Sequence, residues 1–247
     1  MTKSKIEEFE KEKAASIQRM ANDPDVCSST EKWFNTTYKH NYSYNFSWMG
    51  RPIIQYPQDI IAMQEIIWKT KPDIIIETGV AHGGSLILYA SLLHLLGGEG
   101  KVLGIDIDIR PHNREAIESH PMFDRITLME GSSIDNSIVD KVTEFAAQGK
   151  NVLVVLDSNH THEHVMRELE LYSPLVTKGS YLVVFDTVVE HLPEDSFPDR
   201  PWGIGNNPKT AVHEFLKINS RFEIDSEIQN KLQITVAPDG FLKCIKQ

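Results

Sequence analysis

The sequence has few cysteines, no long apolar run and no apolar leader. Its only cysteines, Cys27 and Cys244, lie far apart and do not form a metal-binding motif, so we expect two free thiols in a reducing compartment. No apolar stretch approaches the ~20 residues that a membrane-spanning helix needs, and the charged N-terminus lacks the apolar core of a signal peptide. These absences predict a soluble, cytoplasmic protein without a membrane partner.

Basic residues are too few for a dedicated nucleic-acid-binding protein. The chain of 247 residues has 25 Lys and Arg against 35 Asp and Glu, a formal net charge of −10. Contacts to phosphates need Lys and Arg gathered on one face, and no such run occurs. We therefore expect no nucleic-acid partner. The content of 40% hydrophobic and 24% charged residues is that of a folded chain, long enough for one large α/β domain with extensions.

Strand and helix patterns alternate regularly from residue 57 onward. Each predicted strand is a short, almost continuously apolar run, which is typical of parallel strands covered on both faces. The five predicted strands lie at 73–79, 101–108, 125–133, 151–160 and 179–187. The alternation predicts a Rossmann-like α/β fold, with a mostly parallel sheet and helices on both faces.

The C-terminal end departs from this alternation. Residues 231–246 form two β-type runs around Asp239-Gly240, a residue pair that favours a hairpin turn. We therefore expect a C-terminal antiparallel hairpin. Such an end is unusual for nucleotide-binding dehydrogenases and typical of class I methyltransferases.

Two further segments precede the alternating region. Residues 4–20 have apolar side chains at helical spacing and predict a charged helix, which is a candidate for self-association into a homo-oligomer. The aromatic stretch 33–48 predicts a loop-rich segment that either covers a pocket or packs on the core. We expect 1–56 to form this N-terminal helix and cover, and 57–247 to form the Rossmann-like domain.

Ligands of such sheets bind beyond the carboxyl ends of the strands. The first strand ends in a glycine-rich turn, whose backbone can approach a ligand closely. Its glycine spacing misses the G-x-G-x-x-G dinucleotide pattern. A carboxylate before the first glycine would repel a pyrophosphate but suit the cationic methionine end of S-adenosylmethionine. The candidate cofactor contacts of this turn are Glu77, Thr78, Gly79, His82, Gly83 and Ser85.

The next two strand ends favour a nucleoside ligand. Asp106, followed by Ile107, lies about 20 residues beyond the glycines, and a carboxylate at that place can accept both ribose hydroxyls. NAD-dependent enzymes use an acid in the same way, so Asp106 does not choose between the two cofactors. Ser132 and Ser133 follow the third strand and could border the adenine, with an ordinary loop as the alternative interpretation.

The fourth and fifth strands each end in a carboxylate, Asp157 and Asp186. Two carboxylates on adjacent strand ends can share a hard divalent cation, which could lower the pKa of a substrate hydroxyl. The alternative is that Asp157 caps the following helix and Asp186 is solvated. Asp157 also borders the expected donor site.

Three histidines follow the fourth strand. His160 stands closest to the strand end and is the candidate general base, with His82 in the glycine-rich turn as the second choice. His160 and His164 share a helix face, so this pair could also bind a metal. For His162 and His164, a helix cap or a surface position is the alternative.

Together these motifs resemble the cephalosporin hydroxylase family over about residues 48–216. Despite its name, that family looks like class I S-adenosylmethionine-dependent methyltransferases, including antibiotic-tailoring and sugar O-methyltransferases. The matching segments are 49–59, 64–67, 72–79, 83–85, 104–108, 156–158, 160, 164–165, 168–169, 172, 179–183 and 186.

The resemblance implies a site around S-adenosylmethionine and Mg²⁺. The residues implied at the donor are Glu77, Gly79 and Asp106, and those at the cation are Asp157 and Asp186. Two positions depart from the family, which often has Asp where Asn159 stands and an acid where Phe185 stands. Phenylalanine cannot ligate a metal, so the third protein ligand is left open, and water, backbone or substrate oxygens could complete the shell.

The sequence therefore predicts transfer of a methyl group from S-adenosylmethionine to a hydroxyl of a sugar or a glycosylated small molecule. The acidic chain favours a neutral saccharide, and the segments 33–56 and 190–207 are expected to form its pocket. Two alternatives stay open. One is an NAD(P)-dependent oxidoreductase on a related sheet, and the other is a non-catalytic S-adenosylmethionine-binding relative, which Phe185 favours.

Overall fold

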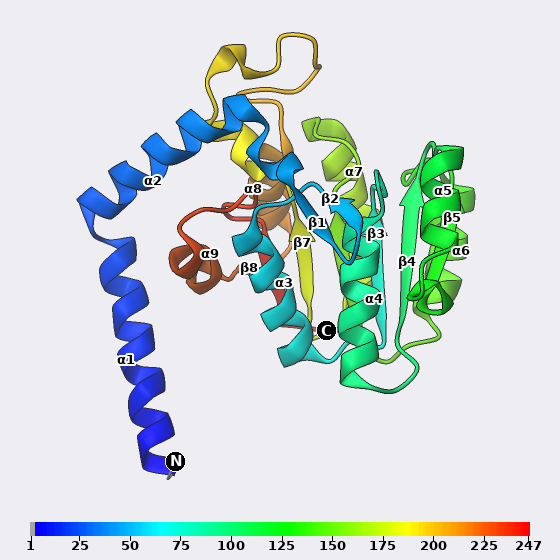
Figure 1. Cartoon of the computed structure of the whole chain (residues 1–247), viewed down its shortest axis with the longest axis horizontal. Helices are drawn as coiled ribbons and strands as arrows, with labels where there is room; N and C mark the ends of the chain where they lie inside the picture. The colour runs from blue at the N-terminus through cyan, green and yellow to red at the C-terminus, as the bar shows by residue number, and fades with distance from the viewer. Residues whose placement is uncertain (1–2) are drawn as a thin grey trace.

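The computed structural model describes residues 3–247 and has a seven-stranded sheet at its centre (Figure 1). Its strands lie in the order β5-β4-β3-β6-β7-β9-β8. The bounds of the strands are β3 Ile74–Thr78, β4 Lys101–Asp106, β5 Ile126–Glu130, β6 Val152–Leu156, β7 Tyr181–Val184, β8 Phe222–Ile224 and β9 Phe241–Cys244. From β5 to β7 all neighbours are parallel, as predicted. The chain reverses its direction of travel across the sheet between β5 and β6, and the carboxyl ends of β3 and β6 are therefore adjacent.

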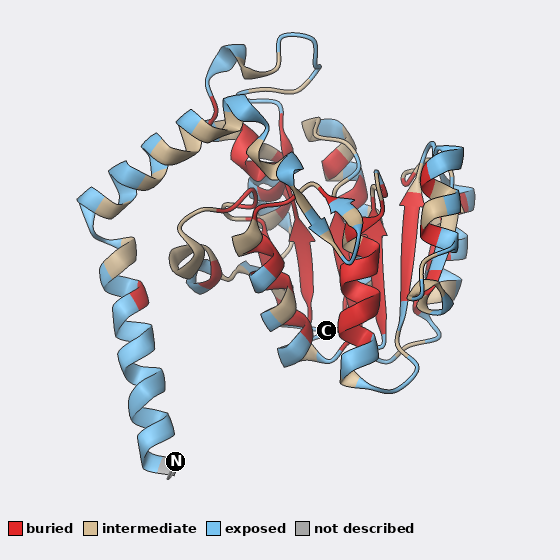
Figure 2. Cartoon of the chain, in the orientation of Figure 1, coloured by how far each residue is buried: buried red, intermediate tan, exposed pale blue. Residues whose placement is uncertain are grey.

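Helices cover both faces of the sheet and enclose two apolar cores (Figure 2). Successive side chains of β3 alternate between them: Ile75 packs with α3 and α4, whereas Ile74 and Ile76 pack with α6, α7 and α8. The bounds of the helices after residue 56 are α3 Pro57–Thr70, α4 Gly84–Leu96, α5 Pro111–Glu118, α6 Asn136–Ala146, α7 His162–Tyr172, α8 Pro208–Ile218 and α9 Ser226–Leu232. Because both faces are covered, the parallel strands read as uninterrupted apolar runs.

The C-terminal strands are antiparallel, as predicted, but the first strand of the expected hairpin was placed wrongly. β9 pairs with β7 and with β8, and α9 lies in the connection between β8 and β9. Asp239 and Gly240 do form a turn, yet the residues before it are not a strand. There the backbone of Val236 bonds elsewhere, its N–H to the Asp59 carboxylate and its carbonyl to the N–H of Val188. These tertiary bonds replace a strand ladder.

The N-terminal segment is more helical than the sequence suggested. α1 spans Lys3–Ala21 as predicted, and α2 spans Pro24–Thr37, where a loop-rich stretch was expected from residue 33. Asp23 caps α2 and Pro24 occupies its first turn, a start signal that the aromatic composition obscured. The remainder consists of the short elements η1 Tyr38–His40, η2 Tyr42–Asn45, β1 Phe46–Trp48 and β2 Arg51–Ile53.

These N-terminal elements lie at one end of the sheet and beyond it. In Figure 1, α1 runs alongside the domain and α2 crosses above α3, next to the yellow loop that follows β7. The short connecting elements after β7 are η5 Thr187–His191 and η6 Glu194–Ser196. None of the helices formed by residues 3–247 is both long and apolar enough to cross a lipid bilayer.

Candidate active site

The glycine-rich turn after β3 is packed so closely that one position admits only glycine. Gly79 has φ +92°, and a Cβ built on it would lie 2.1 Å from the carbonyl oxygen of Asp157. Gly83 has φ +79° and stands just before the first turn of α4. The turn therefore lies flat against the end of β6, and its backbone is open to a ligand from the other side. Thr78 anchors the contact, because its carbonyl accepts the Asp157 N–H at 2.9 Å.

Glu77 points into the domain beneath this turn. Its carboxylate accepts hydrogen bonds from the hydroxyls of Ser85 at 2.6 Å and Tyr89 at 3.2 Å, and the residue is fully buried. Burial raises the pKa of Glu77 to about 8, because no cation offsets the loss of hydration. The side chain thus fixes the start of α4, and a positive charge nearby would favour its ionised form.

Asp106 at the end of β4 ties the glycine-rich turn to the neighbouring strand. Its Oδ2 accepts the N–H of Val80 at 2.8 Å and that of Ala81 at 3.3 Å, and its Oδ1 accepts the N–H of Asp108 at 3.1 Å. Both lone pairs of Oδ2 are engaged, whereas Oδ1 keeps one lone pair free, so the carboxylate can still receive a hydroxyl group. The local structure therefore holds Asp106 in place and leaves part of its capacity as an acceptor available to a ligand.

Two small hollows flank Asp106 and the turn. One, of about 90 Å³, lies at the ends of β4, β5 and β6, and its lining includes Asp106, Ile107, Ser132, Ser133 and His164. The other, of about 40 Å³, includes Gly79, His82, Gly83, Ser85, Asp157 and Gln55 in its lining. All the cofactor candidates except the buried pair Glu77 and Thr78 therefore border one of these hollows.

Gln55 is a further candidate for the site, and the sequence did not reveal it. It follows β2, is 2% exposed, and neither its Oε1 nor its Nε2 has a hydrogen-bond partner among residues 3–247. Such an orphaned amide is costly inside a protein unless a ligand or ordered water satisfies it. Its place in the hollow beside Gly79 and Asp157 fits the polar amino-acid end of a donor such as S-adenosylmethionine.

Arg51 joins the N-terminal segment to the same turn. Its guanidinium donates to the carbonyl of His82 at 2.6 Å and to Oδ1 of Asn113 at 3.2 Å. The His82 ring lies 3.4 Å from the same Asn113 oxygen and forms no ion pair with either strand-end carboxylate. His82 therefore shapes the turn, and although it borders the same hollow as Asp157, it does not belong to the cluster of Asp157, His160 and Asp186.

Asp157, His160 and Asp186 converge at the ends of β6 and β7. Each offers a ligand atom, and these three atoms all lie within 4.8 Å of one another. Nε2 of His160 is 3.2 Å from Oδ2 of Asp186. Burial, followed by the charges of Asp186 and Glu77, raises the pKa of Asp157 well above its ordinary value. The buried Asp59 adds to this density of acids, and burial raises its pKa to about 7.

The arrangement of carboxylates fits a divalent cation. No Lys or Arg within the described residues forms an ion pair with Asp157 or Asp186, so their mutual repulsion is uncompensated by the chain itself. Oxygen ligands from two strand ends are the donors that Mg²⁺ prefers, and an imidazole nitrogen stands beside them. Phe185 takes no part, since it is 2% exposed and packs in the core with α3 and α4.

The three histidines after β6 have different surroundings. His162 contacts Thr210 and Glu214 on α8, away from the carboxylates. His164 lies between the hydroxyls of Ser133 and Ser158, at 3.1 and 3.2 Å, and borders the hollow beside Asp106. Only His160 of this group meets Asp186, so the structure separates the candidates that the sequence left together.

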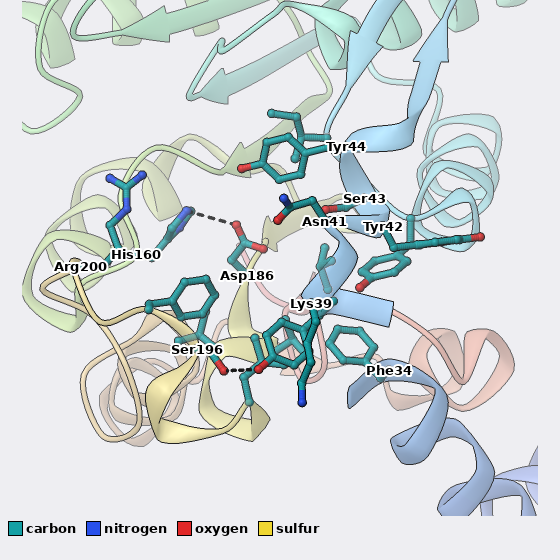
Figure 3. A pocket seen from close by; sticks show the side chains of 18 of the residues that line it. Phe34, Lys39, Asn41, Tyr42, Ser43, Tyr44, His160, Asp186, Ser196 and Arg200 are labelled. Carbon is teal, nitrogen blue, oxygen red and sulfur yellow. Dashed lines mark hydrogen bonds and ion pairs between the residues drawn. The ribbon is translucent and has the colours of Figure 1, made fainter. Parts of the chain in front are cut away.

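A larger cavity of about 480 Å³ opens beside His160 and Asp186 (Figure 3). Aromatic rings form much of its wall, and polar groups are interspersed among them. The aromatic lining residues are Phe34, Tyr38, Tyr42, Tyr44, Tyr56, Phe197 and Trp202. The Trp202 ring meets the His160 ring edge to face at 4.8 Å between centroids. Aromatic walls with a few placed polar groups are typical of small-molecule sites.

Two arms of the chain enclose this cavity. Residues 34–44 form one arm, and the loop 192–202 forms the other. Their only hydrogen bond among described residues joins the hydroxyls of Tyr38 and Ser196, 3.0 Å apart. The prediction that segments 33–56 and 190–207 border a pocket agrees with this geometry, but the individual side chains could not be named from sequence because neither arm has a repeating pattern.

Comparison with protein families gives one match over most of the chain. The family model described as Rhamnosyl O-methyltransferase/CmcI matches residues 40–245. The match includes the glycine-rich turn, both strand-end carboxylates and the loop around the cavity.

Curated relatives are similar over nearly the same span. The rhamnosyl O-methyltransferase of Mycobacterium tuberculosis is 29% identical over 214 residues, covering 85% of this chain and 78% of the relative. The rhamnosyl O-methyltransferase of Mycobacterium leprae is 28% identical over 220 residues, covering 88% of this chain and 90% of the relative.

Solved structures share the fold. The apo structure of CmcI has a TM-score of 0.59 at 19% identity, covering 83% of this chain and 78% of CmcI. A CmcI structure described with Mg and SAM has a TM-score of 0.58 at 19% identity, with 82% and 78% covered.

Proposed function

The chain belongs to the rhamnosyl O-methyltransferase/CmcI family and is an S-adenosylmethionine-dependent O-methyltransferase, and we propose that it methylates a hydroxyl group of a sugar. We further propose that a divalent cation, Mg²⁺ in the first instance, sits at the reacting centre. The family match over residues 40–245 confirms the resemblance that the motifs suggested, at the level of family and reaction. The names of the mycobacterial relatives support the sugar acceptor, and the CmcI structure described with Mg and SAM supports the two small ligands.

One observation carries the proposal: Asp157 stands where the donor hollow and the acceptor cavity meet. Its side chain borders the hollow beside Gly79, and its ligand atom lies within 4.8 Å of those of His160 and Asp186, which line the large cavity. Methyl transfer needs donor methyl and acceptor oxygen in line, at the boundary of two binding sites. The fold supplies such a boundary at the ends of β3, β6 and β7.

We assign the donor to the two hollows around the glycine-rich turn. Asp106 would accept the ribose hydroxyls, and Ser132, Ser133 and Ile107 would border the adenine. The orphaned amide of Gln55 would bind the amino-acid end. Glu77 would lie beneath that end, where the positive charge of the donor lowers the pKa of its carboxyl group. This refines the expectation that Glu77 contacts the ligand directly, since its carboxylate is buried against Ser85 and Tyr89.

We assign the cation to Asp157 and Asp186. When bound there, Mg²⁺ would supply charge that lowers the pKa of an acceptor hydroxyl. The chain's own residues do the rest. His160, held by Asp186 and by the edge of Trp202, is placed to accept the hydroxyl proton, and the two arms border the cavity in which the acceptor would lie.

The acceptor cavity suits a sugar ring. Its volume of about 480 Å³ holds a monosaccharide with part of an aglycone, and its aromatic rings offer flat apolar faces to the C–H faces of a pyranose. Asn41, Ser43 and Ser196 provide hydrogen-bonding groups between these rings. Figure 3 shows them around Asp186, so a hydroxyl near that carboxylate can be reached while the ring packs on the walls.

Calorimetry and a coupled transfer assay test the proposal. We expect S-adenosylhomocysteine to bind with micromolar affinity, and a rhamnoside to receive a methyl group only when a divalent cation is present. Matched titrations with NADH serve as the control. Binding of NADH without binding of S-adenosylhomocysteine would establish an oxidoreductase instead. Donor binding without transfer to any acceptor, whether or not a cation is present, would support the non-catalytic alternative.

Two structural expectations belong to the same proposal. We propose that residues 1–56 act as a cover on a catalytic domain of residues 57–247, and that the chain forms a homo-oligomer. Ile6 and Phe9 are 48% and 56% exposed on α1, which supports a role of this helix in self-association. Light scattering would show a monomer if this second expectation is wrong, and a Phe9→Glu variant would lower the oligomeric state if it is right.

A further inference from the structure

The charges that line the acceptor cavity differ from those of the chain as a whole. The protein carries a formal net charge of −10, yet the lining contains two strong cations, Lys39 and Arg200, and only one carboxylate, Asp186. Figure 3 shows Arg200 beside His160 and Lys39 on the opposite side of Asp186, next to Phe34. Each arm of the cavity thus contributes one cation.

Both cations are exposed, and neither has an acidic partner among the described residues. Other arginines of the chain do form hydrogen bonds: the guanidinium groups of Arg125 and Arg221 donate to backbone carbonyls. The guanidinium of Arg200 and the amine of Lys39 have no side-chain hydrogen bond and no ion pair with any described residue. The acids of the same loop (194, 195 and 199) neither line the cavity nor approach Arg200 within ion-pairing distance.

The position of Arg200 is nevertheless defined. Its guanidinium carbon lies 5.1 Å from the centroid of the Trp202 ring, and that ring contacts His160. A guanidinium that packs over an aromatic ring still has its N–H groups free, because they point outward in the guanidinium plane. They can therefore donate to a carboxylate or a phosphate. The lining therefore holds two formal positive charges, on Lys39 and Arg200, against one negative charge, on Asp186.

We propose that the natural acceptor is an anionic glycoside, one that carries a carboxylate or a phosphate group, and that Lys39 and Arg200 select it. This inference rests on the proposed function and deepens it. It replaces the expectation of a neutral saccharide, which the overall acidity of the chain had suggested. The net charge of the surface does not set the charge of a cavity, because the groups that line it are the nearest charges to a bound ligand.

Three matched probes test the selection: methyl glucoside, methyl glucuronoside and methyl glucoside 6-phosphate. Binding of each to the full-length protein, loaded with S-adenosylhomocysteine and Mg²⁺, is measured by saturation-transfer NMR. We expect the anionic probes to bind about tenfold more tightly than the neutral one, as a charged hydrogen bond allows. The stronger of the two anionic probes identifies the preferred group.

Variants locate the effect. Lys39→Gln and Arg200→Gln should each remove part of the preference, and the double variant should bind all three probes equally. Lys178→Gln, an exposed cation outside the lining, is the matched control and should keep the full preference. Equal binding of the three probes by the wild-type protein, or no binding of any, overturns the inference. Methyl transfer to a neutral glycoside with equal binding of the probes would overturn it while leaving the proposed function intact, whereas loss of S-adenosylhomocysteine binding would defeat the function.

Discussion

The donor side and the acceptor side of the site are built in different ways. On the donor side, the loops after β3 and β4 are short, and backbone atoms fix them. Gly79 lies against the carbonyl of Asp157, and Asp106 binds three backbone N–H groups around it. On the acceptor side, two long arms from distant parts of the chain meet through one hydrogen bond, between Tyr38 and Ser196.

This difference follows from what each side must recognise. A donor that is the same in every turnover favours a rigid, preorganised surface made of backbone and strand ends. An acceptor that differs between relatives favours side chains on irregular segments, which can change without disturbing the sheet. The comparison predicts that changes on one side alter one binding step and leave the other almost unaffected.

The sharpest test is Asp106→Ala on the donor side. It removes the acceptor for the ribose hydroxyls and the three bonds that hold the turn, so the affinity for S-adenosylhomocysteine should fall about 100-fold or more. Asp108→Ala is the matched control, because that side chain is 72% exposed and its ion pair with Arg110 is long, at 4.0 Å. Calorimetry gives both affinities. An Asp106 variant that binds like the control would refute the donor assignment.

Asp186→Asn tests the boundary between the sides. Asp186 has φ +56°, a conformation that asparagine also tolerates, so the fold should survive the change. Turnover should drop by about 10³-fold, because the cation loses a charged ligand, whereas the affinity for S-adenosylhomocysteine should stay within a few-fold. Steady-state kinetics and calorimetry on the same samples measure the two quantities. A parallel loss of donor affinity would show that the two sides are not separable.

Much of the fold and of the donor side followed from sequence, for a physical reason. Buried parallel strands must be apolar throughout, and a turn that approaches the next strand closely must contain glycine. The strand at 73–79, its turn and the neighbouring parallel strands could therefore be predicted from the sequence. The failures lie where tertiary bonds override local pattern. The segment before Asp239 resembled a strand, but its backbone bonds to Asp59 of α3, which no local pattern reveals.

The acceptor side was predicted only as two regions. Tyr38 and Ser196 are 158 positions apart, so their contact has no sequence signal. Gln55 was missed for a similar reason: its importance lies in being buried without a partner, a property of the three-dimensional environment. His160 was separated from His162 and His164 only when α7 and α8 were in place.

His160→Gln distinguishes a proton acceptor from a metal ligand. If His160 accepts the hydroxyl proton, turnover at neutral pH should fall about 100-fold and recover partly as the pH rises, while the affinity for Mn²⁺ stays within a few-fold. Electron paramagnetic resonance of bound Mn²⁺ gives the affinity, and Asp186→Asn provides the comparison for a lost ligand. A Mn²⁺ affinity as low as that of Asp186→Asn would instead assign the His160 nitrogen to the cation.

The buried acid of the donor side should make the ligand-free protein less stable as the pH rises. The pKa of Glu77 is raised from 4.5 to about 8, so the folded state prefers the protonated form. Its contribution to the free energy of unfolding is full below about pH 4.5 and is lost as the pH rises through about 8. Between about pH 6 and pH 9 the melting temperature should fall by several degrees, and by less in Glu77→Gln. Equal slopes in differential scanning calorimetry would contradict the buried, unpaired state of this carboxyl group.

The smallest expected effect lies in the single bond between the arms. Tyr38→Phe removes one hydroxyl and with it the contact to Ser196, worth a few-fold in the KM for the acceptor. Tyr44→Phe is the matched control, since this ring also lines the cavity but is 61% exposed and makes no hydrogen bond to the loop among the described residues.

The affinity for S-adenosylhomocysteine should be the same in both variants, because no part of either arm borders the hollow beside Asp106. A change in donor affinity caused by Tyr38→Phe would mean that closure of the arms is coupled to the donor side, and the two regions would then have to be treated as one.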